Sequence, residues 1–418
     1  MPLTRDLKLA YGVVHRMWVS RRNRRNLVEA DPSRLAPAPG TVRVAVYFAD
    51  GPVNLYQIRQ WYSPLAELNK THPVAIVVRT PATMLALLAE SPVPVVYARQ
   101  VVDLEAFVAS QPIAMTLYVN QNSRNFQMMR YGRMWHVFVN HGESDKMYMT
   151  TNQFKTYDYA FVAGDAAVER LSSKLWDYDL AKRAIPIGRP QADHFRGALP
   201  YTPDERTVVL YAPTWEGDRP SAAYGSIVSH GVPLVGALVA TGRHRVIYRP
   251  HPRSGVVDPT YKAAHESIVA AIAAANAADP SAHHVYDDGP QLGWQLAAAD
   301  VAITDISAMV YDRLATGRPL LVARPASPEA DVDDNGYLGH AEWVTAQDAS
   351  GIVAQVDRVL HDDESQARLA FWTRHHFGDT TPGSATERFE AAVQTLVDRW
   401  HQFEAVHPLK AGESSIDH

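Results

Sequence analysis

Short apolar runs rich in β-branched residues recur along the chain, with polar or helix-patterned segments between them. The first series is Val42–Phe48, Val74–Val78, Val93–Ala98, Ala114–Val119, His136–Val139, Tyr159–Val162 and Ala184–Ile187. The second is Val208–Tyr211, Val246–Tyr248, His284–Tyr286, Val301–Ile303, Leu320–Ala323 and Trp343–Val344. Runs that are largely apolar, rather than alternating, are typical of parallel strands buried on both faces. The pattern predicts an α/β protein with two Rossmann-like domains.

Helical periodicity fills many of the intervals between these runs. It predicts helices at Leu55–Leu68, Ala82–Leu88, Asp103–Ala109, Gly231–Ala240, Tyr261–Ala275, Leu292–Ala299 and Ala308–Ala315. Near the end, Ser384-x-x-Glu387 has the pattern of a capping box that opens a helix through Trp400. We therefore expect a helix and linker at 1–39, domains at 40–195 and 196–378, and a helix with a polar tail at 379–418.

The N-terminal segment has the pattern of a basic amphipathic helix. One face would carry the apolar side chains, and four arginines follow directly (Leu3, Leu7, Ala10, Val14, Met17, Trp18; Arg21, Arg22, Arg24, Arg25). Such a helix is typical of a segment that lies in a membrane interface, here residues 3–25. A terminal helix docked on its own domain has the same pattern, so both interpretations stay open.

Composition narrows the class of protein. The formal net charge is −5, from 40 basic and 45 acidic side chains, which argues against a general nucleic-acid binder. The chain has no cysteine, which excludes disulfides and thiolate sites and fits a cytoplasmic protein. No apolar run approaches the roughly 20 residues that span a bilayer. We expect a cytoplasmic location, with peripheral contact to the inner face of the membrane as an option.

Polar chemistry follows three strands of the second series, the first of which, Val208–Tyr211, leads into Ala212-Pro213-Thr214-Trp215-Glu216. Arg249, His251 and Arg253 come directly after one strand and supply positive charge suited to a diphosphate. The run Thr304-Asp305-Ile306-Ser307 joins another strand to a helix, where hydroxyls, backbone N–H groups and the helix dipole favour an anion. Because parallel strands end at one sheet edge, we expect these groups to lie together. A rigid turn and a simple helix cap are the structural alternatives.

His141 follows a strand of the first series and precedes Gly142. A histidine in this place is suited to take a proton from an alcohol near neutral pH. The alternative is a surface histidine without a chemical role. The sequence has no recognisable pattern of metal ligands, so we expect no metal site and no organic cofactor, and a divalent cation is left open.

Several short motifs, in order, resemble those of one enzyme family. They are His141-Gly142-x-x-x-Lys146, Gly188-Arg189-Pro190-Gln191-Ala192-Asp193, Tyr211-Ala212-Pro213-Thr214-Trp215, Arg249-Pro250-His251-Pro252, Thr304-Asp305-Ile306-Ser307 with Asp312 and Pro319, and Phe377-Gly378-Asp379 leading into Ser384. The set is similar to the CDP-glycerol glycerophosphotransferases, the teichoic acid polymerases and primases, whose fold is GT-B.

The resemblance implies transfer of glycerol phosphate from CDP-glycerol to a hydroxyl of a lipid-linked or polymeric acceptor, with release of CMP. It implies His141 as the base and His251 at the diphosphate. Further positions carried over are the donor-binding Thr214, Arg249, Arg253, Thr304, Asp305 and Ser307, the donor-positioning or structural Asp312, and the acceptor-side Gly142 and Lys146.

This sequence also departs from the family pattern. Glu216 stands where a basic residue is frequent, Ala308 where the second serine is, and Val139-Asn140 where an aromatic is common. The donor-side differences leave CDP-ribitol or a nucleotide sugar open as the donor. A non-catalytic polymer-binding relative is the third alternative.

Overall fold

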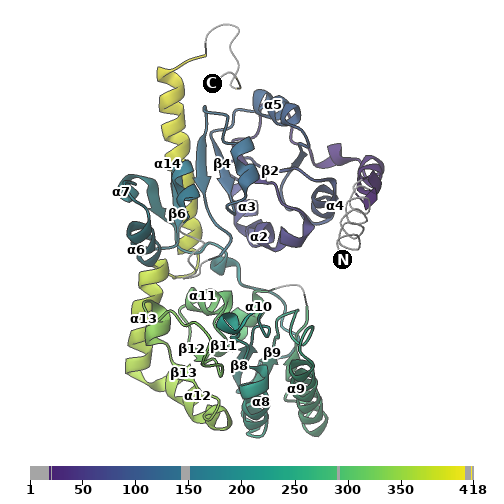
Figure 1. Cartoon of the computed structure of the whole chain (residues 1–418), viewed down its shortest axis with the longest axis vertical. Helices are drawn as coiled ribbons and strands as arrows, with labels where there is room; N and C mark the ends of the chain where they lie inside the picture. Colours follow the sequence, from purple (N-terminus) through teal and green to yellow (C-terminus); the bar gives the residue numbers. More distant parts are fainter. Residues whose placement is uncertain (1–17, 20, 143–150, 290–291, 410–415, 417–418) are drawn as a thin grey trace, which may run out of the picture.

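The computed structural model describes residues 18–19, 21–142, 151–289, 292–409 and 416. Its core is two parallel β-sheets, one in each half of the chain (Figure 1). The first has the order β3-β2-β1-β4-β5-β6-β7: β1 Val44–Phe48, β2 Val74–Val78, β3 Val95–Tyr97, β4 Met115–Tyr118, β5 Trp135–Phe138, β6 Tyr159–Val162, β7 Ala184–Pro186. The second has the order β10-β9-β8-β11-β12-β13: β8 Thr207–Ala212, β9 His244–Tyr248, β10 Val285–Tyr286, β11 Val301–Thr304, β12 Leu320–Ala323, β13 Trp343–Val344.

Helices cover both faces of each sheet, which explains why the strands are apolar throughout. Every residue of β1, β2 and β11 is buried, and each sheet separates two hydrophobic clusters. The helices are α2 Leu55–Arg59, α3 Tyr62–Leu68, α4 Pro81–Glu90, α5 Val101–Ser110, α6 Asp165–Lys174, α7 Leu180–Arg183, α8 Val232–Val239, α9 Pro259–Ala278, α10 Trp294–Ala298, α11 Ala308–Leu314, α12 Ile352–His361, α13 Asp363–Phe377 and α14 Ser384–Val406. The predicted fold class is confirmed.

Each sheet has one point where the chain reverses its direction of travel across the strands. In the first sheet this switch lies between β1 and β4, and in the second between β8 and β11. Loops from the two central strands diverge there, which leaves a crevice beyond the carboxyl ends. Each half of the fold therefore has one point at which a ligand is expected.

The strand predictions are confirmed for all thirteen runs, whereas several helix predictions are incomplete. The predicted helix Leu55–Leu68 is broken into α2 and α3. Pro64 lies in the first turn of α3, and its ring is incompatible with a continuous helix because it lacks an N–H group and clashes with the carbonyl of Gln60. The sequence interpretation missed α6, α12 and α13.

The C-terminal helix α14 returns to the first half of the molecule. Figure 1 shows it running beside β4 and β6. Its buried side chains belong to the core of the first sheet, where Phe389 contacts Trp61 at a ring-centroid distance of 5.3 Å. The Trp135 indole N–H also donates to the Leu396 carbonyl at 3.0 Å. Helix α14 is therefore part of the N-terminal domain.

The predicted capping box at Ser384 is wrong. The Ser384 hydroxyl donates to the Asp379 carbonyl at 2.8 Å, instead of accepting from the helix. The first turn of α14 is held by Asp193, whose carboxylate accepts from the Thr386 backbone N–H at 2.7 Å and from its hydroxyl at 2.9 Å. A side chain from the domain junction therefore satisfies the helix start.

The predicted N-terminal amphipathic helix lies mostly outside the described residues. In the part that is described, residues 21–29 are helical, and Leu27 is buried against the first sheet. Arg22 lies over the exposed ring of Trp18, 5.8 Å from its centroid. Among the described residues, no helix is long and apolar enough to cross a membrane.

Candidate active site

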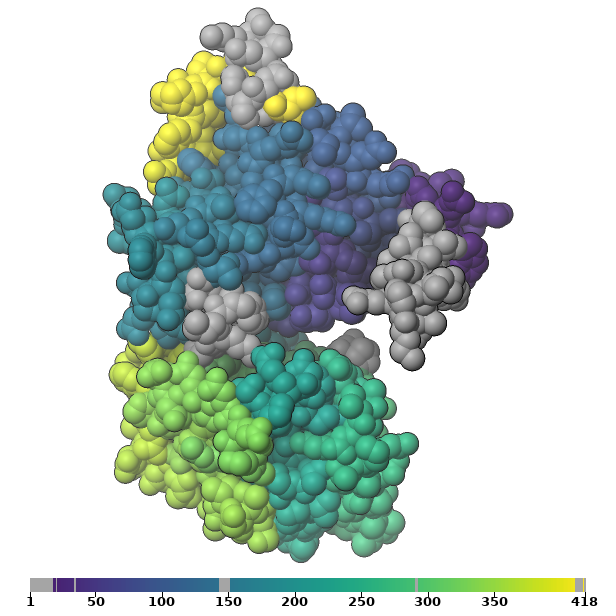
Figure 2. All heavy atoms as spheres, in the orientation of Figure 1, coloured from purple at the N-terminus to yellow at the C-terminus, as the bar shows by residue number. Residues whose placement is uncertain are grey.

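The carboxyl-terminal edges of both sheets are turned towards the junction of the two domains. Arg189, which follows β7, forms a buried ion pair with Asp312 of α11, and both side chains are 6% exposed. The Arg189 guanidinium also donates to Gln60 at 3.4 Å and lies beside Gly142. The His141-Gly142 turn of one domain is thus linked through Arg189 to the helix that follows β11 in the other. In the space-filling view, a notch opens between the domains (Figure 2).

A tight turn places His141 just beyond β5. Asn140 adopts a left-handed conformation, with φ of 56°, which asparagine tolerates better than most non-glycine residues. The side-chain amide of Asn140 donates to the Gly142 carbonyl. The backbone carbonyl of Asn140 accepts from the Trp61 indole N–H. Asparagine therefore fits this backbone conformation and helps to hold the turn.

The imidazole of His141 has a defined tautomer. Its Nδ1 lies 2.9 Å from the Val119 carbonyl, which can only accept, so Nδ1 carries the hydrogen. Nε2 is then the nitrogen with a free lone pair. Burial lowers the pKa of His141 below its ordinary value; the positive charge of Arg189 lowers it further, while the Val119 bond and Asp50 oppose the shift. His141 is thereby a neutral base at pH 7.

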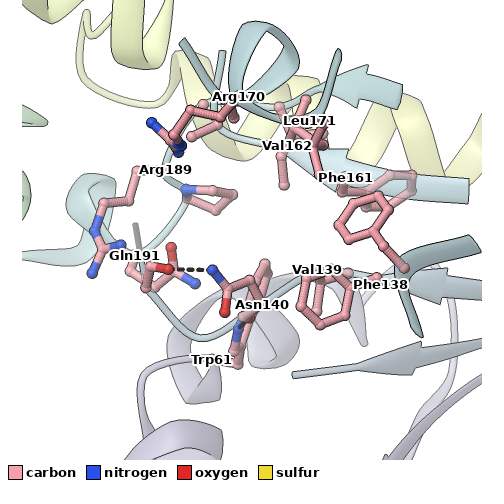
Figure 3. Close-up of a pocket in the computed structure, with 17 residues that line it drawn as sticks. Trp61, Phe138, Val139, Asn140, Phe161, Val162, Arg170, Leu171, Arg189 and Gln191 are labelled. Atoms are coloured by element: carbon pink, nitrogen blue, oxygen red, sulfur yellow. Dashed lines mark hydrogen bonds between the residues drawn. The ribbon is translucent and has the colours of Figure 1, made fainter. Parts of the chain in front are cut away.

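Two cavities flank this turn. On one side is an open polar pocket of about 260 Å³, lined by Asp50, Gln57, Asn120, Gln121, Asn122, Phe138, Asn140 and His141. On the other is a cavity of about 60 Å³, in which Arg189 and Gln191 lie at one end and Phe138 and Phe161 at the other (Figure 3). Of the two, the polar pocket has the room to hold a small substrate group next to the imidazole.

His251 lies beyond β9 and has the opposite tautomer. The backbone N–H of Arg253 donates to His251 Nδ1 at 3.1 Å, so the neutral ring carries its hydrogen on Nε2. Burial lowers the pKa of His251, as does the charge of Arg253, against an opposing effect from Glu216. Arg253 lies over the Trp215 ring, 3.8 Å from its centroid, which fixes the guanidinium near the imidazole.

The charged groups of Arg249 and Glu216 both have partners within the protein. The Arg249 guanidinium is paired with Asp287 and donates to the Gly289 carbonyl at 3.1 Å. The Glu216 carboxylate accepts from the backbone N–H groups of Gly255, Val257 and Asp258 at 3.0 to 3.1 Å. Although burial raises the pKa of Glu216, these bonds lower it below its ordinary value. Glu216 therefore anchors the turn that carries Arg253, which gives this departure from the family pattern a structural reason.

The residues around the β8–β11 switch divide into an exposed and a buried group. Thr214 and Ser307 are partly exposed, and Ser307 caps α11 by accepting from the Met309 N–H at 3.3 Å. Thr304 and Asp305 are fully buried. Neither side chain reaches the surface in this arrangement, so direct donor contact by Thr304 or Asp305 stays a prediction.

Asp305 has a supporting position instead. Its carboxylate accepts from the Thr214 N–H at 2.7 Å and the Ser226 N–H at 3.0 Å, which joins the loop after β8 to β11. Burial raises the pKa of Asp305 to about 7, against these hydrogen bonds. The expected anion site at α11 stays a prediction; the helix has seven residues, and its own cap occupies one N–H group.

A family model decides the assignment. The model for CDP-glycerol:poly(glycerophosphate) glycerophosphotransferases matches residues 135–394, more than half of the chain. The chain belongs to this family. It is therefore a transferase of the CDP-glycerol glycerophosphotransferase type. No curated protein sequence matches the chain.

Solved structures agree on the fold. The wall teichoic acid polymerase TagF has a TM-score of 0.52 and 13% identity over 94% of this chain and 99% of its own; the same values hold for a variant with CDPG. A putative UDP-N-acetylglucosamine 2-epimerase from Listeria monocytogenes has a TM-score of 0.53 and 14% identity over 86% of this chain and 98% of its own. At such identities the likeness shows the fold alone, which is GT-B.

Sequence analysis of this transferase missed Asp50, Gln57 and Asn120, which line the polar pocket beside His141. Asp50 and Asn120 follow β1 and β4, on either side of the switch point, and this placement is the signal that could have found them. The predicted Lys146 lies outside the described residues. Within the described part of the chain, no three His, Asp or Glu side chains are grouped so that they could hold a metal ion.

Proposed function

We propose that this transferase moves glycerol phosphate from CDP-glycerol to a hydroxyl of a lipid-linked or polymeric acceptor. The hydroxyl oxygen attacks the β-phosphorus, and a new P–O bond forms. The bond from that phosphorus to the bridging oxygen breaks, so CMP leaves. The hydroxyl proton passes to His141 Nε2, which keeps the charges balanced.

One observation carries the proposal: the two imidazoles have complementary tautomers, at the carboxyl edges of opposite sheets. His141 offers a lone pair, as a base requires, because the Val119 carbonyl occupies Nδ1–H. His251 offers an N–H, as a donor to a diphosphate requires, because the Arg253 N–H occupies Nδ1. A base and a hydrogen-bond donor are the two groups that phosphoryl transfer to an alcohol needs.

On the donor side we assign direct contact to His251, Arg253, Thr214 and Ser307. Arg253 supplies the positive charge. Arg249, which is paired with Asp287, would affect the electrostatic potential at the donor without contacting it. Thr304, Asp305 and Asp312 would act as positioning residues, since all three are buried. On the acceptor side we assign Gly142 and Lys146.

The histidine assignment is tested with purified protein, CDP-glycerol and an octyl glycerophosphate acceptor, following CMP release. We expect His141→Ala and His251→Ala to lower turnover by about a hundred- to ten-thousandfold, the usual contribution of acid–base catalysis. His361→Ala, an exposed histidine of α12, serves as control and should keep wild-type turnover. Near-normal turnover in His141→Ala would remove the base from the proposal.

The donor assignment has its own comparison. CDP-ribitol and a UDP-sugar are offered in place of CDP-glycerol under the same conditions. The proposal expects the fastest nucleotide release from CDP-glycerol. Faster release from either alternative would assign the enzyme to that donor, and no binding of any cytidine nucleotide by titration calorimetry would favour a non-catalytic polymer-binding relative.

The lipid-linked acceptor implies a position at the inner face of the cell membrane, with residues 3–25 as the contact. Support comes from the exposed Trp18 and the arginines that follow it. We expect the full chain to float with vesicles of anionic lipid, and a chain that lacks residues 1–25 to stay in the dense fraction. Equal flotation of both chains would exclude this segment as the membrane contact.

A further inference from the structure

A buried ion pair joins the two domains directly beside the His141-Gly142 turn. Arg189 follows β7 in the first domain, Asp312 lies in α11 of the second, and each side chain is 6% exposed. Two nitrogens of the Arg189 guanidinium also lie 3.8 and 4.0 Å from the position that a Cβ on Gly142 would occupy. One guanidinium therefore lies next to the residue that follows the proposed base and next to a carboxylate of the other domain.

Stability alone does not explain this ion pair. Removing two charges from water costs free energy, and an apolar pair of similar size is often as stable or more so. The Arg189 Nε–H adds to the cost, because it is buried and has no hydrogen-bond partner among the described residues. A pair that is costly to bury and lies beside a proposed catalytic base points to a role in the chemistry.

Each partner is held by its own side of the junction. The N–H of Gly188, directly before Arg189, donates to the Ala163 carbonyl at 3.0 Å. Helix α11 is anchored by Arg313, the neighbour of Asp312, whose buried guanidinium donates to four backbone carbonyls at 2.7 to 3.1 Å. The ion pair therefore depends on how the two domains dock.

The charge of Arg189 acts on the His141 ring. Burial is the largest cause of the lowered pKa of His141, and Arg189 lowers it further, against the Val119 hydrogen bond and the Asp50 charge. Among the described residues, several segments contribute titratable or charged side chains around the ring and its turn: Asp50, Tyr56, Arg170 and Arg189. A change in how far the Arg189 charge is offset therefore changes how strongly His141 holds a proton.

We infer that Asp312 is a positioning residue for the base of the opposite domain, and that it acts through Arg189. Its carboxylate holds the guanidinium beside the His141-Gly142 turn and offsets the positive charge there. The full proton affinity of His141 thus requires a residue from each domain. The inference rests on the proposed function and deepens it, since it gives a residue of the donor domain a part in setting the acceptor-side base.

The test measures His141 directly, without turnover. The full chain is labelled with ¹⁵N in its histidine rings, and the His141 signals are those absent from His141→Gln. In Arg189→Gln the titration midpoint of His141 should rise by about half a pH unit or more, because a nearby positive charge is lost. In Asp312→Asn it should fall by a similar amount, because the Arg189 charge is no longer offset.

The double variant shows whether Asp312 acts through Arg189. Arg189→Gln/Asp312→Asn should have the midpoint of Arg189→Gln, because burial raises the pKa of an unpaired Asp312 and keeps it neutral, so asparagine changes no charge. The acidic limb of kcat/KM for CMP release should move with the midpoint in each variant. As matched controls, Arg243→Gln and Asp357→Asn break an exposed ion pair of 2.8 Å within the second domain and should leave the His141 midpoint unchanged.

The outcomes separate the two proposals. An unchanged midpoint in Arg189→Gln would overturn the inference, as would a midpoint that moves without the kcat/KM limb, or an Asp312→Asn shift that persists without Arg189. Each of these results leaves the transferase proposal intact if the wild-type enzyme releases CMP and His141→Ala does not. Near-normal turnover in His141→Ala would remove the base from the proposed function, and this inference with it. Arg189→Gln leaves no buried charge, because the carboxyl can take a proton, so its midpoint decides even where Asp312→Asn fails to fold.

Discussion

At the scale of single residues, the backbone decides what each imidazole can do. A neutral histidine is a base or a donor according to which nitrogen carries its hydrogen. In this enzyme a carbonyl sets the choice for His141 and an N–H group sets it for His251. The sequence predicted that both histidines follow strands. It did not predict the tautomer of His141, because Val119 is 22 residues distant from His141.

The lowered pKa of His141 has a measurable consequence. If His141 is the base, as we propose, its neutral form is the active one, so activity is complete above its pKa and is lost as pH falls through it. Because burial lowers this pKa from 6.5, we expect the acidic limb of log kcat/KM to have its midpoint below 6.5. A midpoint above 6.5 would contradict the environment described for the ring.

The same pH series needs a control for unfolding. Burial lowers the pKa of His376 to about 3. Its folded pKa thus lies below that of the unfolded chain, so the folded state loses stability as pH falls below about 6.5. Circular dichroism at each pH distinguishes loss of the base from loss of the fold.

At the scale of elements, strands were predictable and several helices were not. Buried parallel strands have continuous apolar runs, so composition alone locates them. Helix α13 buries Ser365, Thr373 and His376 alongside Phe377. Polar side chains at buried positions remove the periodic apolar stripe on which helix prediction depends. The cap that Asp193 gives to α14 was equally hidden, because it joins residues 193 positions apart.

In the candidate site, too, some features were predictable from the sequence and others were not. Motif order placed His141, His251 and Arg253 at strand ends, where they are found. Burial of Thr304 and Asp305 could not be predicted, because it depends on how the loop after β8 folds over β11. The pairing of Arg189 with Asp312 depends on two domains meeting, which no local pattern records.

Gly188 gives a test at this scale, since the start of α14 packs directly against it. Its φ is 73°, and a Cβ there would lie 2.2 Å from Arg388 Nη2 and 3.1 Å from the Phe377 carbonyl. We expect Gly188→Ala to lower the free energy of unfolding by about 1–2 kcal/mol or more, from backbone strain and the displaced Arg388. Urea unfolding measures the change.

Gly236→Ala is the matched control. Gly236 lies within helix α8, and a Cβ there would meet nothing within 4 Å. Alanine should therefore stabilise the protein by about 0.5–1 kcal/mol. Equal effects of the two substitutions would show that the contact with α14 is unimportant.

At the scale of the whole molecule, the junction combines a buried ion pair with two crossings of the chain. The chain passes from the first domain to the second after Arg189, and it returns after α13. Arg189 and Asp312 join the His141-Gly142 turn of one domain to the helix after the switch strand of the other. Relative movement of the two domains would therefore change the position of His141.

The return of α14 also governs how the protein is made. Phe389, Val393 and Leu396 complete the core of the first sheet, yet they leave the ribosome after all thirteen strands of both sheets. Until then the nascent N-terminal domain exposes an apolar face that α14 covers in the folded protein. Emergence of α14, rather than emergence of the first sheet, is thus the moment at which this domain acquires its full stability.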